Sequence, residues 1–160
     1  MSHGCYKRLT GCFKVDCTRV LAILALIILI PVYAHAAPAQ SKAPLVVVNQ
    51  ANPQDSMSLG SLRTMFGMRL RTWPDGTPIK VIVLPDNRPL HVKFCKQVLG
   101  IFPHQLRWAW DRLVYSGTGQ APQQVSTEEQ MLQALEGTPG AIGYLSQLPS
   151  DAKVKRIRIR

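Results

Sequence analysis

The sequence predicts an α/β domain. Short apolar runs rich in β-branched residues alternate along the chain with segments whose apolar residues recur every three or four positions, and turns containing Gly or Pro separate them. The length of 160 residues suits one domain. Hydrophobic residues make up 46% of the chain, which excludes a disordered protein, and the 11 Gly, 12 Pro and 4 Cys exclude collagen-like and disulfide-dense chains.

The first 36 residues have the order of a secretory signal. An apolar run at residues 20–33 (VLAILALIILIPVY) follows four basic residues and precedes Ala34-His35-Ala36, the small-residue pattern that a signal peptidase reads. The run has about 14 residues, fewer than the roughly 20 of a transmembrane helix. Two outcomes stay open: cleavage after Ala36, or retention as an N-terminal membrane anchor. In both, we expect the rest of the chain in the periplasm, either free or held at the inner membrane.

The export segment changes how the charge and the cysteines are interpreted. Residues 1–36 contain four basic residues and one acidic residue, so the formal charge falls from +10 for the whole chain to +7 for the remainder. Three of the four cysteines also lie in this segment, which leaves Cys95 alone in the exported part. We therefore expect no disulfide in that part and a buried, inert Cys95 thiol.

A linker and the first strand and helix follow the export segment. Residues 37–44 (APAQSKAP) are small or flanked by Pro and predict a linker. The run at residues 45–49 (LVVVN) predicts a buried strand. A helix capped by Ser56 or Ser58 then ends near Gly67, because the apolar residues between them fall on one helical face: Leu59, Leu62, Met65 and Phe66.

The second strand is predicted at residues 79–84 (IKVIVL), after a tight turn at residues 73–77 (WPDGT). A sharp loop leads to a helix that begins at Pro89 and ends before Gly100, since proline suits the first turn of a helix and glycine the position after its last turn. His91 is expected on the surface of this helix, whose inward residues are predicted to be Leu90, Phe94, Cys95 and Val98.

The remaining elements are two helices and two strands. One helix begins at Pro103, and after a Gly-rich loop the spacing of Ser126 and Glu129 predicts a capping box at the start of the next. Residues 141–145 (AIGYL) predict a strand. Residues 153–160 (KVKRIRIR) alternate partly between apolar and basic residues, which predicts an edge strand guarded by its charges.

Three stretches of the sequence together resemble the phosphate-binding periplasmic proteins of ABC transporters. They are residues 59–67 (LGSLRTMFG) followed by Trp73, the second strand with its loop and helix, and residues 139–144 (PGAIGY). Their order and approximate spacing are similar to those proteins, and above all to short members with a single lobe. The resemblance implies one lobe of the type II periplasmic-binding-protein fold over residues 45–160, with a mixed sheet flanked by helices.

The resemblance also implies a site after the second strand. Full-length phosphate binders carry an arginine at the end of that strand, then an aspartate, then Ser-Gly-Thr at the start of a helix whose N–H groups and hydroxyls hold the anion. Here Asp86 matches the aspartate, whereas Leu84 replaces the arginine and residues 88–90 (RPL) replace the tripeptide. Arg88 is expected to supply the missing charge. The implied site residues are Asp86, Asn87, Arg88 and, near the exit of the first strand, Ser56.

Ser116, Gly117 and Thr118 spell the Ser-Gly-Thr tripeptide at a different place in the chain. They follow the helix that carries Trp108 and Trp110, where the family has another Gly-rich connector. Two interpretations stay open: a surface loop without a ligand, or a contact in which the hydroxyls of Ser116 and Thr118 touch the ligand.

Length and motifs limit the functional classes. Proteins of this type close two lobes around a ligand, which needs roughly 250 residues, so one lobe offers a half-site that a second copy or an envelope or transporter protein would complete. No nucleophile elbow, HExxH, CxxC or paired-carboxylate motif occurs, so we expect neither an enzyme nor a metal or cofactor. The basic C-terminal end and Trp108 suit nucleic acid, but export and the core-like spacing of Trp110 argue against it.

Two hypotheses remain. The first is an exported, non-enzymatic module that binds phosphate or a similar oxyanion and is related to ABC-transporter substrate-binding proteins. In it, Asp86 accepts a hydrogen bond from a protonated oxyanion and disfavours a fully ionised one such as sulfate. The second is an envelope protein–protein interaction module that keeps the lobe but binds no ligand.

Overall fold

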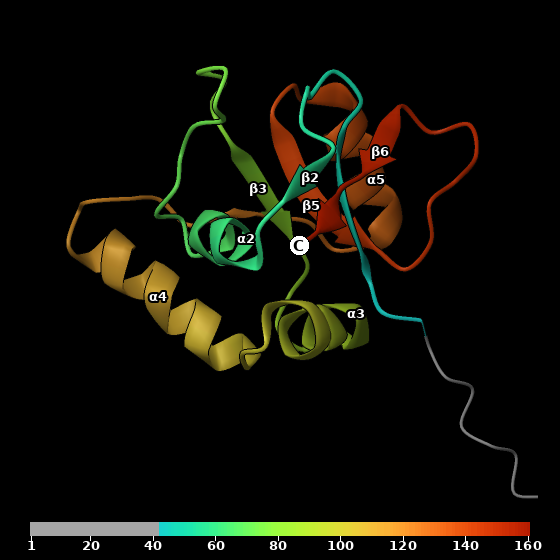
Figure 1. Ribbon diagram of the computed structural model, residues 1–160. Coiled ribbons are helices and arrows are strands. Elements are labelled where there is room, and N and C mark those ends of the chain that lie inside the picture. The colour runs from blue at the N-terminus through green and yellow to red at the C-terminus, as the bar shows by residue number, and fades with distance from the viewer. Residues whose placement is uncertain (1–41) are drawn as a thin grey trace, which may run out of the picture. The chain divides into compact units, whose positions relative to one another are not determined.

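A five-stranded mixed sheet forms the centre of the computed structural model, which describes residues 42–160 (Figure 1). The strand order is β4-β3-β5-β1-β6; β3 runs parallel to β4 and β5, whereas β1 runs antiparallel to β5 and β6. The bounds of the strands are β1 Leu45–Asn49, β3 Lys80–Val83, β4 Gln123–Gln124, β5 Ala141–Leu145 and β6 Val154–Arg156. The predicted α/β class and mixed sheet are confirmed.

Helices and one short ribbon complete the described part of the chain. The ribbon pairs β2 (Ser56–Met57) in parallel with β7 (Arg158–Ile159). The helices are α2 Leu59–Phe66, α3 Pro89–Lys93, the π-helical segment η1 Phe94–Leu99, α4 Pro103–Tyr115 and α5 Glu128–Gly137. Within this part no helix is both long and apolar enough to cross a membrane. The predicted signal or anchor at residues 1–36 and the start of the predicted linker lie outside the described residues.

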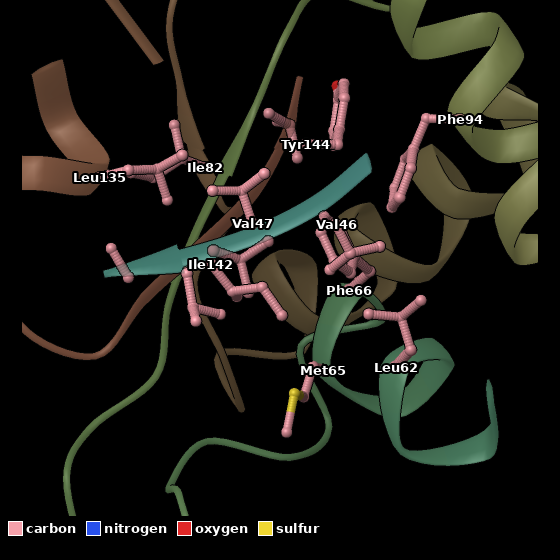
Figure 2. Close-up of a cluster of buried hydrophobic side chains, with 14 of the residues drawn as sticks. Val46, Val47, Leu62, Met65, Phe66, Ile82, Phe94, Leu135, Ile142 and Tyr144 are labelled. Atoms are coloured by element: carbon pink, nitrogen blue, oxygen red, sulfur yellow. The ribbon is translucent and has the colours of Figure 1, made fainter. Parts of the chain in front are cut away.

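Both faces of the sheet are covered, which explains why its central strands are apolar without alternation. Neighbouring residues of a strand point to opposite faces, and Tyr144 stacks on Phe94 with 4.0 Å between ring centroids, while Gly143 lies against Met131 of α5. Figure 2 shows the same division, with Ile82 beside Leu135 of α5 and Phe94 toward Tyr144. The core therefore consists of two layers, one on each face of the sheet.

The stretches that resemble phosphate binders meet in this core as packing positions. The Trp73 indole N–H donates to the Gly140 carbonyl over 2.9 Å. Gly140 has a φ of 76°, and a Cβ there would lie 2.3 Å from the Pro78 carbonyl oxygen, so only glycine fits. Gly143 is also tight, because a Cβ there would lie 3.1 Å from Met131 Sδ. These motif residues hold the loops to the sheet.

Most predicted elements are confirmed, and one open alternative is resolved. The strands at residues 45–49 and 141–145 have the predicted bounds. Ser58 caps α2, accepting a hydrogen bond from the Ser61 N–H, and Gly67 ends that helix. Gly100, at a φ of 68°, follows η1 as predicted, and Cys95 and Trp110 are buried.

Four local predictions were wrong. The helix expected from Pro89 to residue 99 changes to π-helical geometry at Phe94, and His91 within it is wholly buried. The cap of α5 is Thr127, whose side chain accepts the Gln130 N–H, rather than Ser126. The basic C-terminal segment forms two strands, not one, because Ile157 turns into the core between β6 and β7.

Candidate functional site

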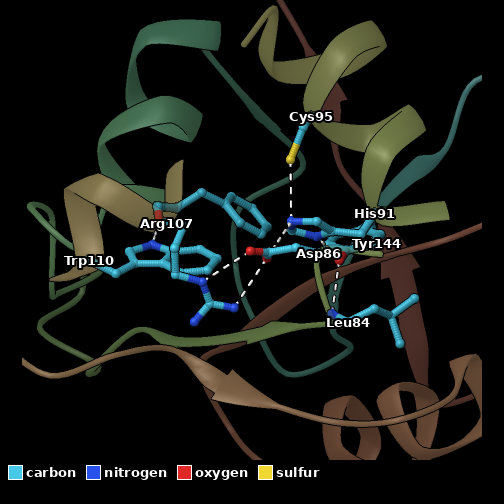
Figure 3. Close-up of polar contacts among 8 residues, drawn as sticks. Leu84, Asp86, His91, Cys95, Arg107, Trp110 and Tyr144 are labelled. Atoms are coloured by element: carbon cyan, nitrogen blue, oxygen red, sulfur yellow. Dashed lines mark hydrogen bonds and ion pairs between the residues drawn. The ribbon is translucent and has the colours of Figure 1, made fainter. Parts of the chain in front are cut away.

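The end of β3 is held by a buried tyrosine. Leu84 is 2% exposed, and its N–H donates a 2.9 Å hydrogen bond to the Tyr144 hydroxyl of β5 (Figure 3). The chain then turns, with the Arg88 N–H donating to the Pro85 carbonyl over 2.9 Å, and α3 begins at Pro89. Three of the implied site residues lie between β3 and α3 and form what we call the 86–88 turn: Asp86, Asn87 and Arg88.

His91, in the first turn of α3, links the 86–88 turn to β5. Its Nδ1 lies 2.5 Å from the Tyr144 hydroxyl oxygen. Because this oxygen already accepts the Leu84 N–H, the hydroxyl proton is free to bond the imidazole. Both hydrogen bonds of the Tyr144 hydroxyl form when His91 is neutral and its Nδ1 is the acceptor.

The buried groups at the turn are uncharged near neutral pH. Burial lowers the pKa of His91 below its ordinary 6.5, an effect that the Asp86 carboxylate opposes and the Arg107 charge reinforces. His91 Nε2 lies 3.4 Å from Cys95 Sγ and 3.6 Å from Asp86 Oδ1. Burial raises the pKa of the Cys95 thiol to about 12 and raises the pKa of Tyr144 further still. These groups therefore position the turn through hydrogen bonds rather than through charge.

The carboxylate of Asp86 is gripped by an arginine from α4. Arg107 Nε donates to Oδ2 over 3.0 Å and Nη2 donates to Oδ1 over 3.2 Å, the fork geometry of a bidentate pair. The guanidinium also lies 5.2 Å from the ring centroid of Trp110. The hydrogen bond to Asp86 is the main reason that the pKa of Arg107 rises. Both side chains remain about one-third exposed, so solvent screens the pair.

The 86–88 turn presents a half-open surface with donors and acceptors. Two of the five N–H groups of Arg107 bond Asp86, and among the described residues the other three have no acceptor. Arg88 and Asn87 are exposed. Each Asp86 oxygen accepts one bond from Arg107 and keeps a second lone pair. The turn can therefore donate to an anion and accept one bond from a protonated oxyanion.

The loop at residues 116–118 lies at the far end of α4 (Figure 1). Ser116 follows Arg107 by nine positions, which is about 13 Å along the helix axis. Ser116 and Thr118 are exposed, and their hydroxyl oxygens bond each other over 2.8 Å. Thr118 lines a groove of about 660 Å³ with Arg71 and Lys80, and its carbonyl accepts from the Arg71 guanidinium. The structure does not bring this loop to the 86–88 turn.

Ser56 lies in a third region of the structure, in strand β2 of the short ribbon. Its hydroxyl accepts a 3.0 Å hydrogen bond from Arg160 Nε and lines a groove of about 560 Å³ whose wall includes Trp73. The groove lined by Ser56 and the groove lined by Thr118 are separate, and neither is lined by a residue of the 86–88 turn. Among the implied site residues, the structure therefore groups only Asp86, Asn87 and Arg88.

Sequence reasoning missed Arg107 and His91 as partners of Asp86. A signal for His91 was present, because it precedes Cys95 by four residues and shares its helix face, which was already predicted to point inward. Arg107 precedes the buried Trp110 by three residues, which places its stem near the core side of α4. Its pairing with Asp86 joins two elements, and the sequence carries no signal for that.

The described residues offer no group of three or more His, Cys, Asp or Glu placed to hold a metal ion. The one cysteine among them, Cys95, is buried with a raised pKa, so its thiol is protonated at neutral pH and is a poor nucleophile.

No known protein family and no curated protein matches the sequence, whereas solved structures match the fold. An ABC-type phosphate transport receptor from Vibrio cholerae aligns with a TM-score of 0.54 and 16% identity, over 73% of this chain and 46% of its own. A protein named as a phosphate ABC transporter substrate-binding protein from Clostridium perfringens, solved with bound phosphate, gives 0.55 and 15%, over 73% and 44%. A possible phosphate-binding protein from Planctomyces limnophilus gives 0.50 and 14%, over 74% and 41%.

The chain spans less than half the length of each of these structures. At 14–16% identity the match concerns the fold, and all three are described as receptors or binding proteins. The fold implied by the three sequence stretches is thereby confirmed: this chain has the fold of about one lobe of phosphate-binding ABC-transporter receptors.

Proposed function

We propose that this chain is an exported, non-enzymatic module that binds phosphate or a similar oxyanion at the 86–88 turn. The carrying observation is that the Asp86–Arg107 pair lies at the end of β3, two residues before Arg88, in a lobe whose structural neighbour from Clostridium perfringens was solved with phosphate. A forked guanidinium matches the geometry of an oxyanion, and a carboxylate beside it selects a protonated one.

The division of roles follows from the contacts. Arg88 is exposed and supplies a cation whose charge also acts on the Glu129 carboxylate, while Arg107 is fixed by Asp86 and offers its remaining N–H groups. Asp86 accepts a hydrogen bond from an HPO₄²⁻ or H₂PO₄⁻ hydroxyl, and Asn87 contributes an amide donor. Sulfate has no proton to donate at neutral pH, so the turn disfavours it.

A second surface is needed for tight binding. The turn is open to water, and an open anion site is weak because solvent screens its charges. A second copy of the chain or an envelope or transporter protein would close it. Export through residues 1–36 would place the module in the periplasm, free or held at the inner membrane, and N-terminal sequencing of the exported protein separates these two states.

Titration calorimetry of the full chain with inorganic phosphate tests the proposal. We expect binding that Arg88→Ala weakens several-fold. Arg156→Ala is the matched control, since it removes the same charge from an exposed position on β6, three strands away from β3, or about 14 Å. Millimolar or weaker binding that Arg88→Ala leaves unchanged would contradict the proposal.

A second function has two observations in its favour. Leu84 is buried where the resemblance implies a ligand-binding arginine, and both Asp86 oxygens are already engaged by Arg107. This favours an interaction module that keeps the lobe and binds no ligand. The same calorimetry decides between the two, and a stable dimer that binds phosphate would favour the first.

A further inference from the structure

Exposed aromatic rings line the outer side of α4 in what we call the aromatic stripe: Phe102, His104, Trp108 and Tyr115. Phe102 is 52% exposed, Trp108 65% and Tyr115 89%, and His104 is exposed as well. His104, Trp108 and Tyr115 are spaced four and seven residues apart, so they share one helix face. The opposite face carries the buried Leu106 and Trp110. The stripe is thus the solvent side of an otherwise well-packed helix.

The rings of the stripe are ordered against one another. Phe102 and His104 stack with centroids 5.6 Å apart, and His104 meets Trp108 edge-on at 5.1 Å. Lys96 Nζ lies 5.3 Å from the Phe102 centroid, within the range of a cation–π contact. Phe102, His104 and Trp108 thus form one exposed aromatic cluster, with Tyr115 further along the same helix face, and exposed clusters of this kind are typical of interaction sites.

Two features of the stripe match a phospholipid surface. The rings project into solvent, with Trp108 65% and Tyr115 89% exposed, so they can enter a bilayer without unpacking the core. Aromatic rings that carry an N–H or a hydroxyl, as in Trp108 and Tyr115, prefer the boundary between lipid headgroups and acyl chains.

The charge around the stripe identifies the kind of lipid. Lys96 and Arg112 are exposed beside the rings, with Asp111 as a nearby acidic residue. The exported part carries a formal charge of +7, so its long-range attraction is to negative surfaces. Each basic side chain near an anionic bilayer strengthens binding to it, whereas apolar rings alone do not distinguish anionic from neutral lipids.

We propose that the aromatic stripe docks α4 on an anionic phospholipid bilayer, with the rings in the headgroup region and Lys96 and Arg112 on lipid phosphates. This docking is independent of phosphate binding at the 86–88 turn. A retained N-terminal anchor would strengthen it, because tethering raises the local concentration of the stripe at the bilayer.

Acrylamide quenching of tryptophan fluorescence tests the docking on the full chain. Trp108 is its one exposed tryptophan, since the other two, Trp73 and Trp110, are 2% and 1% exposed. The chain is mixed with phosphatidylcholine vesicles that contain phosphatidylglycerol, and separately with vesicles of phosphatidylcholine alone. Insertion of the apolar run at residues 20–33 contributes in both samples, and acrylamide is uncharged, so the difference reports the stripe.

We expect the quenching constant to fall several-fold with anionic vesicles relative to neutral ones, with a shift of the emission to shorter wavelength. Trp108→Phe gives the baseline of the two buried rings. Replacing both Lys96 and Arg112 by Glu should abolish the difference between the vesicles. Arg156→Glu, on β6, is the charge-matched control and should leave most of it.

Three results would overturn the proposal. The first is a quenching constant with anionic vesicles equal to that in buffer. The second is equal shielding by both kinds of vesicle, since anionic headgroups would then play no part. The third is shielding that arises without lipid and grows with protein concentration, because it would assign the stripe to a second copy of the chain.

Discussion

The 86–88 turn and the 116–118 loop differ in what lies beneath them. The turn follows a buried strand end, and Tyr144, His91 and Arg107 each hold a group in it or next to it. In the loop, Ser116 and Thr118 bond each other, the end of α4 and the Arg71 guanidinium, all at the surface. The loop contains the Ser-Gly-Thr tripeptide of phosphate binders, whereas residues 88–90 (RPL) stand where the resemblance implies it. A binding site depends on support from the core. The 86–88 turn is therefore the better candidate, although its residues match the motif of phosphate binders less well.

The largest expected difference between the two regions is in stability. Tyr144→Phe removes the hydroxyl that accepts the Leu84 N–H and bonds His91 Nδ1, leaving two buried polar groups unpaired. We expect the free energy of unfolding to fall by about 1–3 kcal/mol. Urea denaturation followed by circular dichroism measures it.

The matched change in the loop is Ser116→Ala, which removes one exposed hydroxyl. Its effect should stay within about 0.5 kcal/mol. Equal losses for the two variants would contradict the contrast between a turn held by buried groups and a loop held by surface contacts.

A pH dependence should arise from the turn and not from the loop. The pKa of His91 is lowered in the folded protein, so below 6.5 the unfolded chain binds a proton that the folded chain refuses. The stabilising contribution is complete above pH 6.5 and is lost as the pH falls toward the folded value. The slope can reach about 1.4 kcal/mol per pH unit.

Urea denaturation at a series of pH values measures this slope for the wild type and for His91→Gln. In the variant, the free energy of unfolding should depend much less on pH below 6.5. A slope that is the same in both proteins would show that His91 is not the group responsible.

Only a small effect is expected from the coupling between Asp86 and Arg107. Because both side chains are about one-third exposed, a double-mutant cycle with Asp86→Ala and Arg107→Ala should give a coupling energy below about 1 kcal/mol. A coupling above about 2 kcal/mol would mean that the pair is a structural anchor. Its role in presenting donors to a ligand would then lose support.

The sequence predicted the fold well where local chemistry decides it. The β-branched run at residues 45–49 and the strand at 141–145 are buried on both faces, so their composition alone identifies them. Gly100 marks a helix end because its φ of 68° is left-handed, a conformation that glycine adopts more easily than other residues, whereas Gly67 ends α2 at an ordinary φ of −75°. The change from α- to π-helix at Phe94 left no comparable signal, since the same apolar spacing suits both.

The site was less predictable because it depends on contacts between distant segments. Asp86 was found through the resemblance, but its partner Arg107 comes from another helix. A lone histidine in a helix favours a surface position, whereas His91 is buried with partners that include the Tyr144 hydroxyl, 53 residues away in the sequence. Such pairings follow from the packing of α3 and α4 around β3 and β5.

The most direct test of the central claim is a ¹H–¹⁵N NMR titration of the full chain with inorganic phosphate. The account predicts saturable shifts of the Asp86, Asn87 and Arg88 amides that Arg88→Ala abolishes, with the Ser116 and Thr118 amides unmoved. Sulfate at the same ionic strength should have a much weaker effect, since it has no proton for Asp86 to accept. Shifts confined to the 116–118 loop, or equal shifts with both anions, would contradict the account.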